Sequence, residues 1–429
     1  MRLSPIYFRF IKLLTIALLT NQFVPFNALA NPQTPAPVNS PTSTAAQKSP
    51  KALVEEVWQI VERKYIDKNF NQQDWNAVRQ RYLNQSYGSY EEAYQAIRKM
   101  LELLDDPFTR FLNPVEFKTL QASSSDVAGI GLQLVNNRDT QAVTIIEPIE
   151  NSPAQKGGLL PQDIITAIDG KPVERKSVSE VAALLRGKAG TSVTLGVLRS
   201  GQPLTFRVQR AQIEIPAVQY RVQETTIGRV GYVRLTQFSA KATQEMKAAI
   251  EALEKQNVKG YAIDLRSNPG GLFRASIDIA RMWLSNGVII TSVDRDGKRE
   301  QELANNGALT QKPLVVLVDG GSTHASEALA AALQENQRAL LVGTQTPGYS
   351  SVQLVQGLQN GTGLFVTVSK WLTPAGRDIQ GTGLVPDAVV EMTDRQRQEL
   401  LGERKIGTAA DPQFAKALEM LNQKLRTPR

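Results

Sequence analysis

The sequence predicts a multidomain α+β protein with an N-terminal helical segment, a small β-rich domain and an α/β core built on a mostly parallel sheet. Three observations lead to this fold class. Apolar residues recur at helical spacing near the N-terminus, short alternating runs separated by Gly and Pro fill the middle, and strands alternate with helices in the last half. With 429 residues the chain is long enough for about three domains.

The N-terminus has the pattern of an export signal. Three basic residues precede the apolar run 13–19, and residues 28–30 read Ala-Leu-Ala, which is a cleavage site of the A-x-A type. The alternative is a short membrane anchor, but the run is too short to span the ~30 Å of hydrocarbon in a bilayer. Residues 1–30 are therefore predicted to be a signal peptide.

Residues 31–50 are rich in Pro, Ser, Thr, Ala and Gln, so they are predicted to be a disordered linker. The next segment, 51–119, has apolar residues at helical spacing and forms the N-terminal helical region. Ser89 and Glu92 have the spacing of a capping box for its second helix.

The predicted β-rich domain covers residues 120–213. Alternating runs such as 164–168 and 193–198 are separated by turns, and one helix is expected at about 178–186. Ser177 and Glu180 have the spacing to cap that helix.

The predicted core covers residues 214–395, in which strands and helices alternate. Such alternation is typical of βα crossovers around a mostly parallel sheet. The remaining residues, 396–429, form a helical tail. The expected strands are 231–235, 260–265 and 314–318, and the expected helices are 241–255, 274–284, 325–335 and, in the tail, 411–425.

Composition excludes several classes of function. The formal net charge is +8, but the basic residues are dispersed, which argues against nucleic-acid binding and leaves contact with an anionic membrane surface open. The chain has one His and no Cys, so we expect no disulfide, no metal site and no cofactor.

Residues 128–134 read Ala-Gly-Ile-Gly-Leu-Gln-Leu and resemble the carboxylate-binding loop of a PDZ domain. In such a loop the backbone N–H groups bind the carboxylate of a protein C-terminus, and the following strand pairs with the peptide. The resemblance implies a ligand with apolar end residues. The residues expected to bind it are Gly129, Ile130, Gly131, Leu132 and Leu134, with Val181 and Leu185 on the facing helix.

From about residue 52 onward the chain resembles the C-terminal processing peptidases, also called tail-specific proteases, of the cyanobacterial and plastid branch. Two motifs carry the resemblance. Residues 322–327 read Ser-Thr-His-Ala-Ser-Glu where the family has S-x-S-x-S-E, and residues 346–353 read Thr-Pro-Gly-Tyr-Ser-Ser-Val-Gln where it has T-F-G-K-G-x-V-Q. The core should therefore have the ββα-spiral-like architecture of these enzymes.

The family cuts with a Ser/Lys dyad, and both positions differ here. The resemblance places His324 at the nucleophile position and Tyr349 at the general-base position. Gln353 matches the residue that orients the Lys, and here it is expected to hydrogen-bond only Tyr349 or solvent. Gly271 and Ala325 match the backbone donors of the oxyanion hole.

These substitutions predict an exported homologue that binds C-terminal tails but does not cut them, because loss of a nucleophile or base costs roughly a millionfold in another serine protease. Its further partner would be an active relative or another copy of itself, in the periplasm or the thylakoid lumen. Two alternatives stay open. One is an active serine-type endopeptidase that processes the C-termini of exported proteins, and the other is a scaffold whose core serves oligomerisation.

Overall fold

The computed structural model describes residues 49–121, 128–136, 142–149, 152–213, 216–402 and 405–426. The predicted signal peptide and nearly all of the predicted linker lie outside the described residues. Among the described residues, no helix combines the length and apolar character needed to cross a membrane.

The N-terminal region contains three helices that bury their apolar faces together, followed by a short strand and a fourth helix. Trp58 stacks on Trp75 with ring centroids 6.5 Å apart, and their two indole N–H groups donate to each other's backbone carbonyls. Ser89 caps the third helix, which the sequence predicted as the second because the helix before it was not expected. The Glu92 carboxylate accepts from the Gly88 N–H instead of closing the predicted capping box on Ser89. The elements are α1 (Pro50–Lys64), α2 (Trp75–Leu83), α3 (Tyr90–Glu102), β1 (Arg110–Leu112) and α4 (Pro114–Gln121).

The β-rich domain has its own core. Its main sheet has the order β3-β4-β5-β7-β8, with β6 paired to β5, while β2 pairs with β9. Ser177 and Glu180 form the predicted capping box. The elements are β2 (Ala128–Gly129), β3 (Leu132–Asn136), β4 (Val143–Pro148), α5 (Pro153–Lys156), β5 (Ile164–Ile168), β6 (Lys171–Pro172), α6 (Val178–Leu185), β7 (Ser192–Arg199), β8 (Gln202–Gln209) and β9 (Ala211–Gln212).

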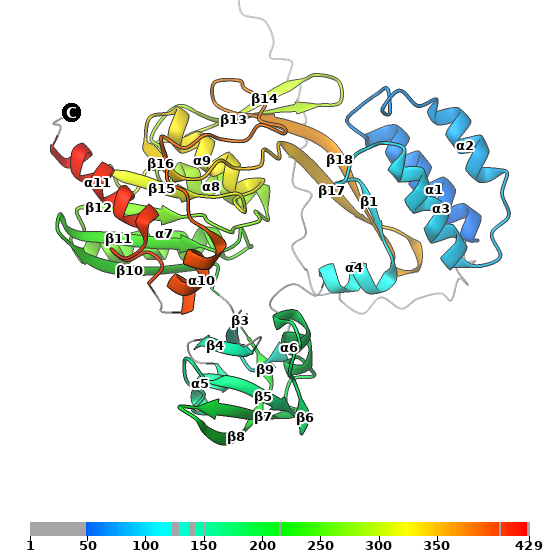
Figure 1. The fold of residues 1–429 in the computed structure, drawn as a ribbon. Coiled ribbons are helices and arrows are strands. Elements are labelled where there is room, and N and C mark those ends of the chain that lie inside the picture. The colour runs from blue at the N-terminus through cyan, green and yellow to red at the C-terminus, as the bar shows by residue number, and fades with distance from the viewer. Residues whose placement is uncertain are drawn as a thin grey trace, which may run out of the picture. The chain divides into compact units, whose positions relative to one another are not determined.

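The core contains the mostly parallel sheet that the sequence predicts, with the order β10-β11-β12-β15-β16-β19 (Figure 1). Only the β10–β11 pair is antiparallel. The strands are β10 (Val218–Thr225), β11 (Gly228–Leu235), β12 (Gly260–Asp264), β15 (Leu314–Val318), β16 (Ala339–Gly343) and β19 (Ala388–Val389).

Helices cover both faces of this sheet, because side chains alternate along its strands. On β15, Leu314, Val316 and Val318 pack toward α7 (Ala242–Lys255), α8 (Phe273–Arg281) and α9 (Ala325–Glu335). Val315 and Leu317 pack toward α11 (Pro412–Arg426), the helix predicted for the tail, while α10 (Asp394–Gly402) precedes it. The helix predicted to reach residue 284 ends at Arg281, where tighter i to i−3 hydrogen bonds begin.

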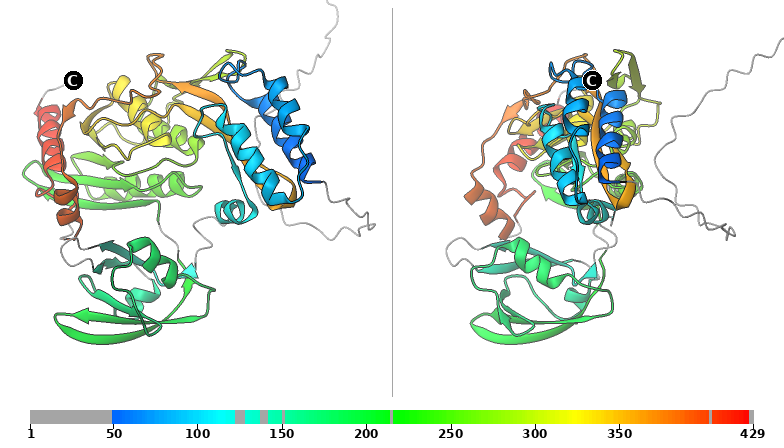
Figure 2. Two further views of the ribbon diagram at one scale, coloured as in Figure 1. Left: turned by 45° about the vertical axis from the view of Figure 1, so that its right-hand side comes forward. Right: turned by 90° about the vertical axis from the view of Figure 1, so that its right-hand side faces the viewer.

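A second sheet was not expected from the sequence. It is antiparallel, with the order β1-β18-β13-β14 and with β17 on the other edge of β18. Its long strand β18 lies against the N-terminal helices (Figure 2), where Leu364 and Val366 join the core of those helices. The remaining elements are β13 (Val288–Asp294), β14 (Arg299–Leu303), β17 (Ser351–Gly357), the short 3-10 helix η1 (Gln359–Gly361) and β18 (Gly363–Leu372).

Candidate active site

His324 lies at the turn between strand β15 and helix α9. The strand is fully buried and ends at Val318, and the chain then turns back so that α9 begins at Ala325. His324 has φ 52° and ψ −107°, a backbone conformation that a residue with a Cβ adopts only under strain. Such strained turns are typical of positions that present a reactive side chain.

The carboxylate of Glu327 holds this turn. It is fully buried and accepts four hydrogen bonds. The backbone N–H of His324 donates at 3.0 Å and that of Tyr349 at 2.9 Å, while the Gly348 N–H donates at 2.7 Å and the Thr346 hydroxyl at 2.6 Å. One side chain therefore fixes the backbone at both dyad positions.

The side chains at these two positions touch. The ring centroids of His324 and Tyr349 are 5.0 Å apart, and no hydrogen bond joins the two rings. Phe108, from the loop before β1, contacts both. Burial lowers the pKa of the His324 imidazole below its usual value, which favours the neutral ring.

The two remaining serines of the motif are not available as nucleophiles. Ser322 and Ser326 are both fully buried. The Ser322 hydroxyl donates to the Leu265 carbonyl at 2.8 Å, and the Ser326 hydroxyl donates to the Asn268 carbonyl at 2.9 Å. Both hydroxyls thus fasten the start of α9 to the segment that follows β12.

That segment contains the turn in which the oxyanion donor Gly271 was expected. Gly270 and Gly271 both have positive φ, at 94° and 133°, and a Cβ on Gly270 would lie 3.1 Å from both the Ala325 nitrogen and the His324 Cβ. The turn is thus packed directly against the start of α9, where Ala325 provides the other expected donor. Within the described part of the chain, neither the Gly271 nor the Ala325 N–H donates a hydrogen bond.

The expectation for Gln353 was wrong in one respect. Gln353 does not bond Tyr349. Its amide donates to the Ser351 hydroxyl at 2.9 Å and, more weakly, to the Thr367 hydroxyl at 3.4 Å. Gln353 lies on β17 and Thr367 on the paired strand β18, so the amide spans the two strands instead of turning toward the dyad positions.

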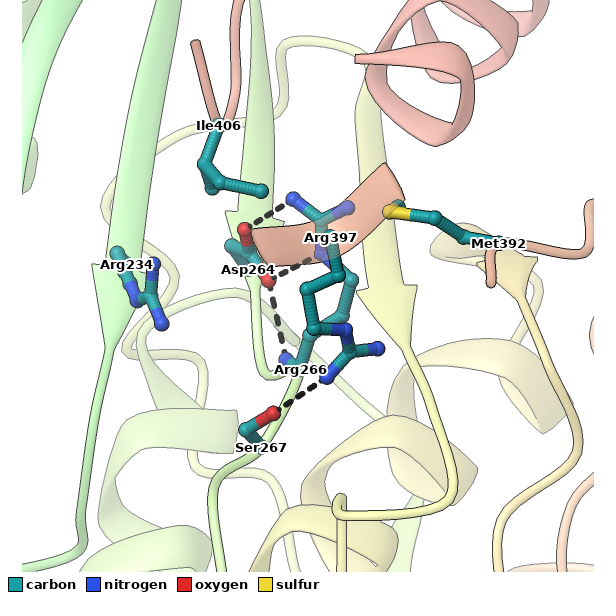
Figure 3. A pocket seen from close by; sticks show the side chains of 7 residues that line it. All are labelled: Arg234, Asp264, Arg266, Ser267, Met392, Arg397 and Ile406. Carbon is teal, nitrogen blue, oxygen red and sulfur yellow. Dashed lines mark hydrogen bonds and ion pairs between the residues drawn. The ribbon is translucent and has the colours of Figure 1, made fainter. Parts of the chain in front are cut away.

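The sequence reasoning missed the charged residues that support the site. Arg397 on α10 donates to the Ser267 hydroxyl at 2.7 Å (Figure 3). It also pairs with Asp319 at 2.6 Å. Asp319 also accepts from the Ser267 N–H at 2.8 Å. Arg397 therefore connects the C-terminal tail to two segments, the one after β12 that contains Ser267 and the one before His324 that contains Asp319. No local sequence pattern indicates this contact.

A second arginine, Arg266, also connects the core to the C-terminal tail; it directly precedes Ser267 in the sequence. Arg266 is almost fully buried between Asp264 and Asp411, at 2.6 Å and 2.8 Å. Burial alone would raise the pKa of Asp264, but the adjacent guanidinium outweighs it and holds that pKa well below its usual range. Asp411 precedes α11, so the tail is anchored beside the site at two points.

The PDZ-like residues also come together. The loop is fixed through its carbonyl groups, since Ala154 N–H donates to the Ile130 carbonyl at 2.8 Å and Ile149 N–H to that of Gly131 at 2.9 Å. Strand β3, which carries Leu132 and Leu134, pairs on one edge with β4 and is packed against α6. Val181 and Leu185 are buried in the domain core, and Gly129 is in the short strand β2.

Among the described residues, no group of three or more His, Cys, Asp or Glu is placed to hold a metal ion. The pocket drawn in Figure 3 has a volume of about 30 Å³ and is bordered by the arginines and Asp264 described above.

Known proteins match this chain along most of its length. The model of peptidase family S41 matches residues 229–390, the PDZ domain model 144–199, and the tricorn protease C1 domain model 48–85. The carboxyl-terminal-processing protease of Synechocystis is 42% identical over 387 residues, covering 89% of each chain. The chloroplastic carboxyl-terminal-processing peptidase 2 of Arabidopsis thaliana is 37% identical, covering 77% of this chain and 67% of its own.

A solved structure described as a photosystem II D1 C-terminal processing protease is also similar. It has 34% sequence identity and a TM-score of 0.58, and the match covers 86% of this chain and all of that one. The similarity extends over the helical region, the β-rich domain and the core.

Proposed function

Because the chain belongs to peptidase family S41, the carboxyl-terminal-processing proteases, and contains a PDZ domain, we propose that it binds the C-terminal tails of exported proteins without cutting them. One observation supports this most directly. An imidazole and a phenol are in ring contact at the two dyad positions, and no hydrogen bond joins them.

The proposed loss of cleavage follows from the chemistry of the two groups. Tyr349 presents a hydroxyl where the family has an amine, and no hydrogen bond connects it to His324 through which a proton could be taken. An imidazole that attacks a peptide carbonyl forms a labile acyl-imidazole and must expel an amine, with no acid hydrogen-bonded beside it. The neighbouring hydroxyls cannot substitute, since Ser322 and Ser326 are buried and bonded to backbone carbonyls.

The proposed binding rests on the PDZ domain. A β3 strand with one edge not paired to another described strand, facing α6, is the arrangement that accepts an extended peptide by strand addition. The glycine-containing loop 129–131 precedes that strand, where backbone N–H groups bind a terminal carboxylate in such domains. Tails with apolar end residues are therefore the proposed ligands, in the periplasm or the thylakoid lumen.

The test compares single-turnover cleavage of a tail peptide by the native chain and by the double variant His324→Ser, Tyr349→Lys. We expect the native chain to be at least ~1000-fold slower than the double variant. The matched control is His324→Ala, Tyr349→Lys, which differs from the double variant by one hydroxyl and should be as inactive as the native chain. Cleavage by the native chain that His324→Ala abolishes would contradict the proposal and favour an active endopeptidase.

Binding is measured in parallel by titration with the same peptide in two forms. A free C-terminal carboxylate should bind, and the C-terminal amide should bind at least ~10-fold more weakly, because it removes the charge that the loop recognises. Equal affinity for the two forms, or no binding of either, would contradict recognition of C-terminal tails. It would favour the alternative of a scaffold whose core serves oligomerisation.

A further inference from the structure

Three aromatic rings from distant parts of the sequence meet at the dyad positions. Phe108 contacts His324 with ring centroids 5.2 Å apart and planes at 87°, and it contacts Tyr349 at 5.1 Å and 71°. His324 and Tyr349 are 5.0 Å apart. These are edge-to-face and tilted contacts at van der Waals separation, so no extended peptide fits between the rings.

The loop that carries Phe108 is held in place by hydrogen bonds. The Asp106 carboxylate accepts from the Phe108 N–H at 3.0 Å, from the Thr109 hydroxyl at 2.6 Å and from the Thr367 hydroxyl at 2.7 Å. The Thr109 hydroxyl in turn accepts from the Thr367 N–H at 3.0 Å. Because Thr367 lies on β18, the loop is fixed to the core and not only to the N-terminal helices.

The position of the rings decides what they block. A peptide that is to be cut must bring its carbonyl carbon within about 3–3.5 Å of the nucleophile position. Here the imidazole at that position is covered by Phe108 on one side and contacts Tyr349 on another, and it is partly buried. The oxyanion donors expected at Gly271 and Ala325 lie in the segments that meet at His324, because Gly270 packs against the His324 Cβ and the Ala325 nitrogen.

We propose that Phe108, His324 and Tyr349 form an aromatic seal that keeps bound tails out of the candidate active site, so that a tail is held at the PDZ domain alone. This inference rests on the proposed function and deepens it. The seal explains absence of cutting by exclusion of the substrate, in addition to the loss of the dyad chemistry. It also gives Phe108 a role as a positioning residue, since its ring covers the other two.

The only histidine of the chain makes the seal measurable. Carbethoxylation of the imidazole by diethyl pyrocarbonate reports directly on access to position 324. In the native full-length chain we expect the reaction to be slow. Phe108→Ala should accelerate it about tenfold, as expected when two ring contacts are lost.

Two further variants separate the seal from general loosening of the fold. Asp106→Asn keeps the ring but weakens the bonds that hold its loop, and it should give an intermediate rate. Phe365→Ala removes another partly buried ring from β18, where Phe365 contacts Arg110, and should leave the rate unchanged. Equal acceleration by Phe365→Ala and Phe108→Ala would contradict a specific seal.

The same samples receive a tail peptide with a benzophenone near its C-terminus, and cross-linked residues are located by mass spectrometry. In the native chain cross-links should fall in 128–213, and in Phe108→Ala they should appear also in the core. Core cross-links in the native chain without cleavage would refute the seal and leave the proposed function standing. Cleavage by the native chain would refute the proposed function itself.

Discussion

The candidate site has two layers that differ in composition and in burial. The inner layer, Ser322, Ser326 and Glu327, is fully buried and makes its hydrogen bonds mainly to backbone groups, with the Thr346 hydroxyl as a further donor to Glu327. The outer layer, His324 and Tyr349, is partly buried and makes ring contacts. The inner layer matches the protease motif and the outer layer departs from it. The comparison shows that the motif residues which maintain the backbone geometry are retained here, although the Ser and Lys of the family's dyad are replaced.

Glu327→Gln should break the inner layer most severely. The amide would turn an NH₂ group toward backbone donors that now bind a carboxylate, so we expect a loss of ~3 kcal/mol in the free energy of unfolding. Urea denaturation measures it. Glu399→Gln, at an exposed carboxylate on α10, is the matched control and should change stability by less than about 0.5 kcal/mol.

Ser326→Ala should have a smaller effect of the same kind. The hydroxyl donates to the Asn268 carbonyl, which also accepts from the Thr323 N–H at 3.0 Å and so keeps a partner. The expected loss is ~1 kcal/mol in urea denaturation. Any cleavage that the double variant His324→Ser, Tyr349→Lys acquires should survive the added Ser326→Ala, and its abolition would assign Ser326 a role in the chemistry.

His324, in the outer layer, should make the free energy of unfolding of the chain depend on pH. Burial lowers its pKa in the folded chain, so below the unfolded value of about 6.5 the unfolded state binds the proton more readily. The free energy of unfolding should therefore fall as pH decreases from 7 through the folded pKa. His324→Phe should remove this part of the slope between pH 7.5 and pH 5. An unchanged slope would show that the imidazole is not desolvated.

Tyr349→Phe should change least. Within the described part of the chain the Tyr349 hydroxyl makes no hydrogen bond, while the ring makes two contacts that Phe preserves. Unfolding should shift by less than about 0.5 kcal/mol. A loss above ~1 kcal/mol would mean that the hydroxyl has a partner, and the outer layer would then resemble the inner one.

Much of the fold follows from the sequence because its strands and helices have strong local patterns. The run Leu314–Val318 is apolar throughout, as a strand buried on both faces must be. The antiparallel sheet was missed for the opposite reason. Strands such as β14 and β17 are rich in polar and exposed residues, and β1 pairs with β18 some 250 residues away in sequence, so no local pattern reveals the pairing.

The site was predictable where it depends on motif position and unpredictable where it depends on packing. The positions of His324 and Tyr349 follow from the spacing of two short motifs. The ring of Phe108 and the guanidinium of Arg397 reach the site from segments that no spacing rule connects to it. The hydrogen-bond partner predicted for Gln353 was wrong, because its amide donates to hydroxyl groups on β17 and β18, those of Ser351 and Thr367.

Strand β18 has a consequence for the order of folding. The N-terminal helices complete their core with Leu364 and Val366, and β1 pairs with residues 363–365. During synthesis or export these helices emerge before β18 and lack one side of their core until it follows roughly 260 residues later, counted from residue 102 to residue 363. The helices therefore reach their native packing only after β18 is available, and their apolar faces depend on protection from aggregation in the interval.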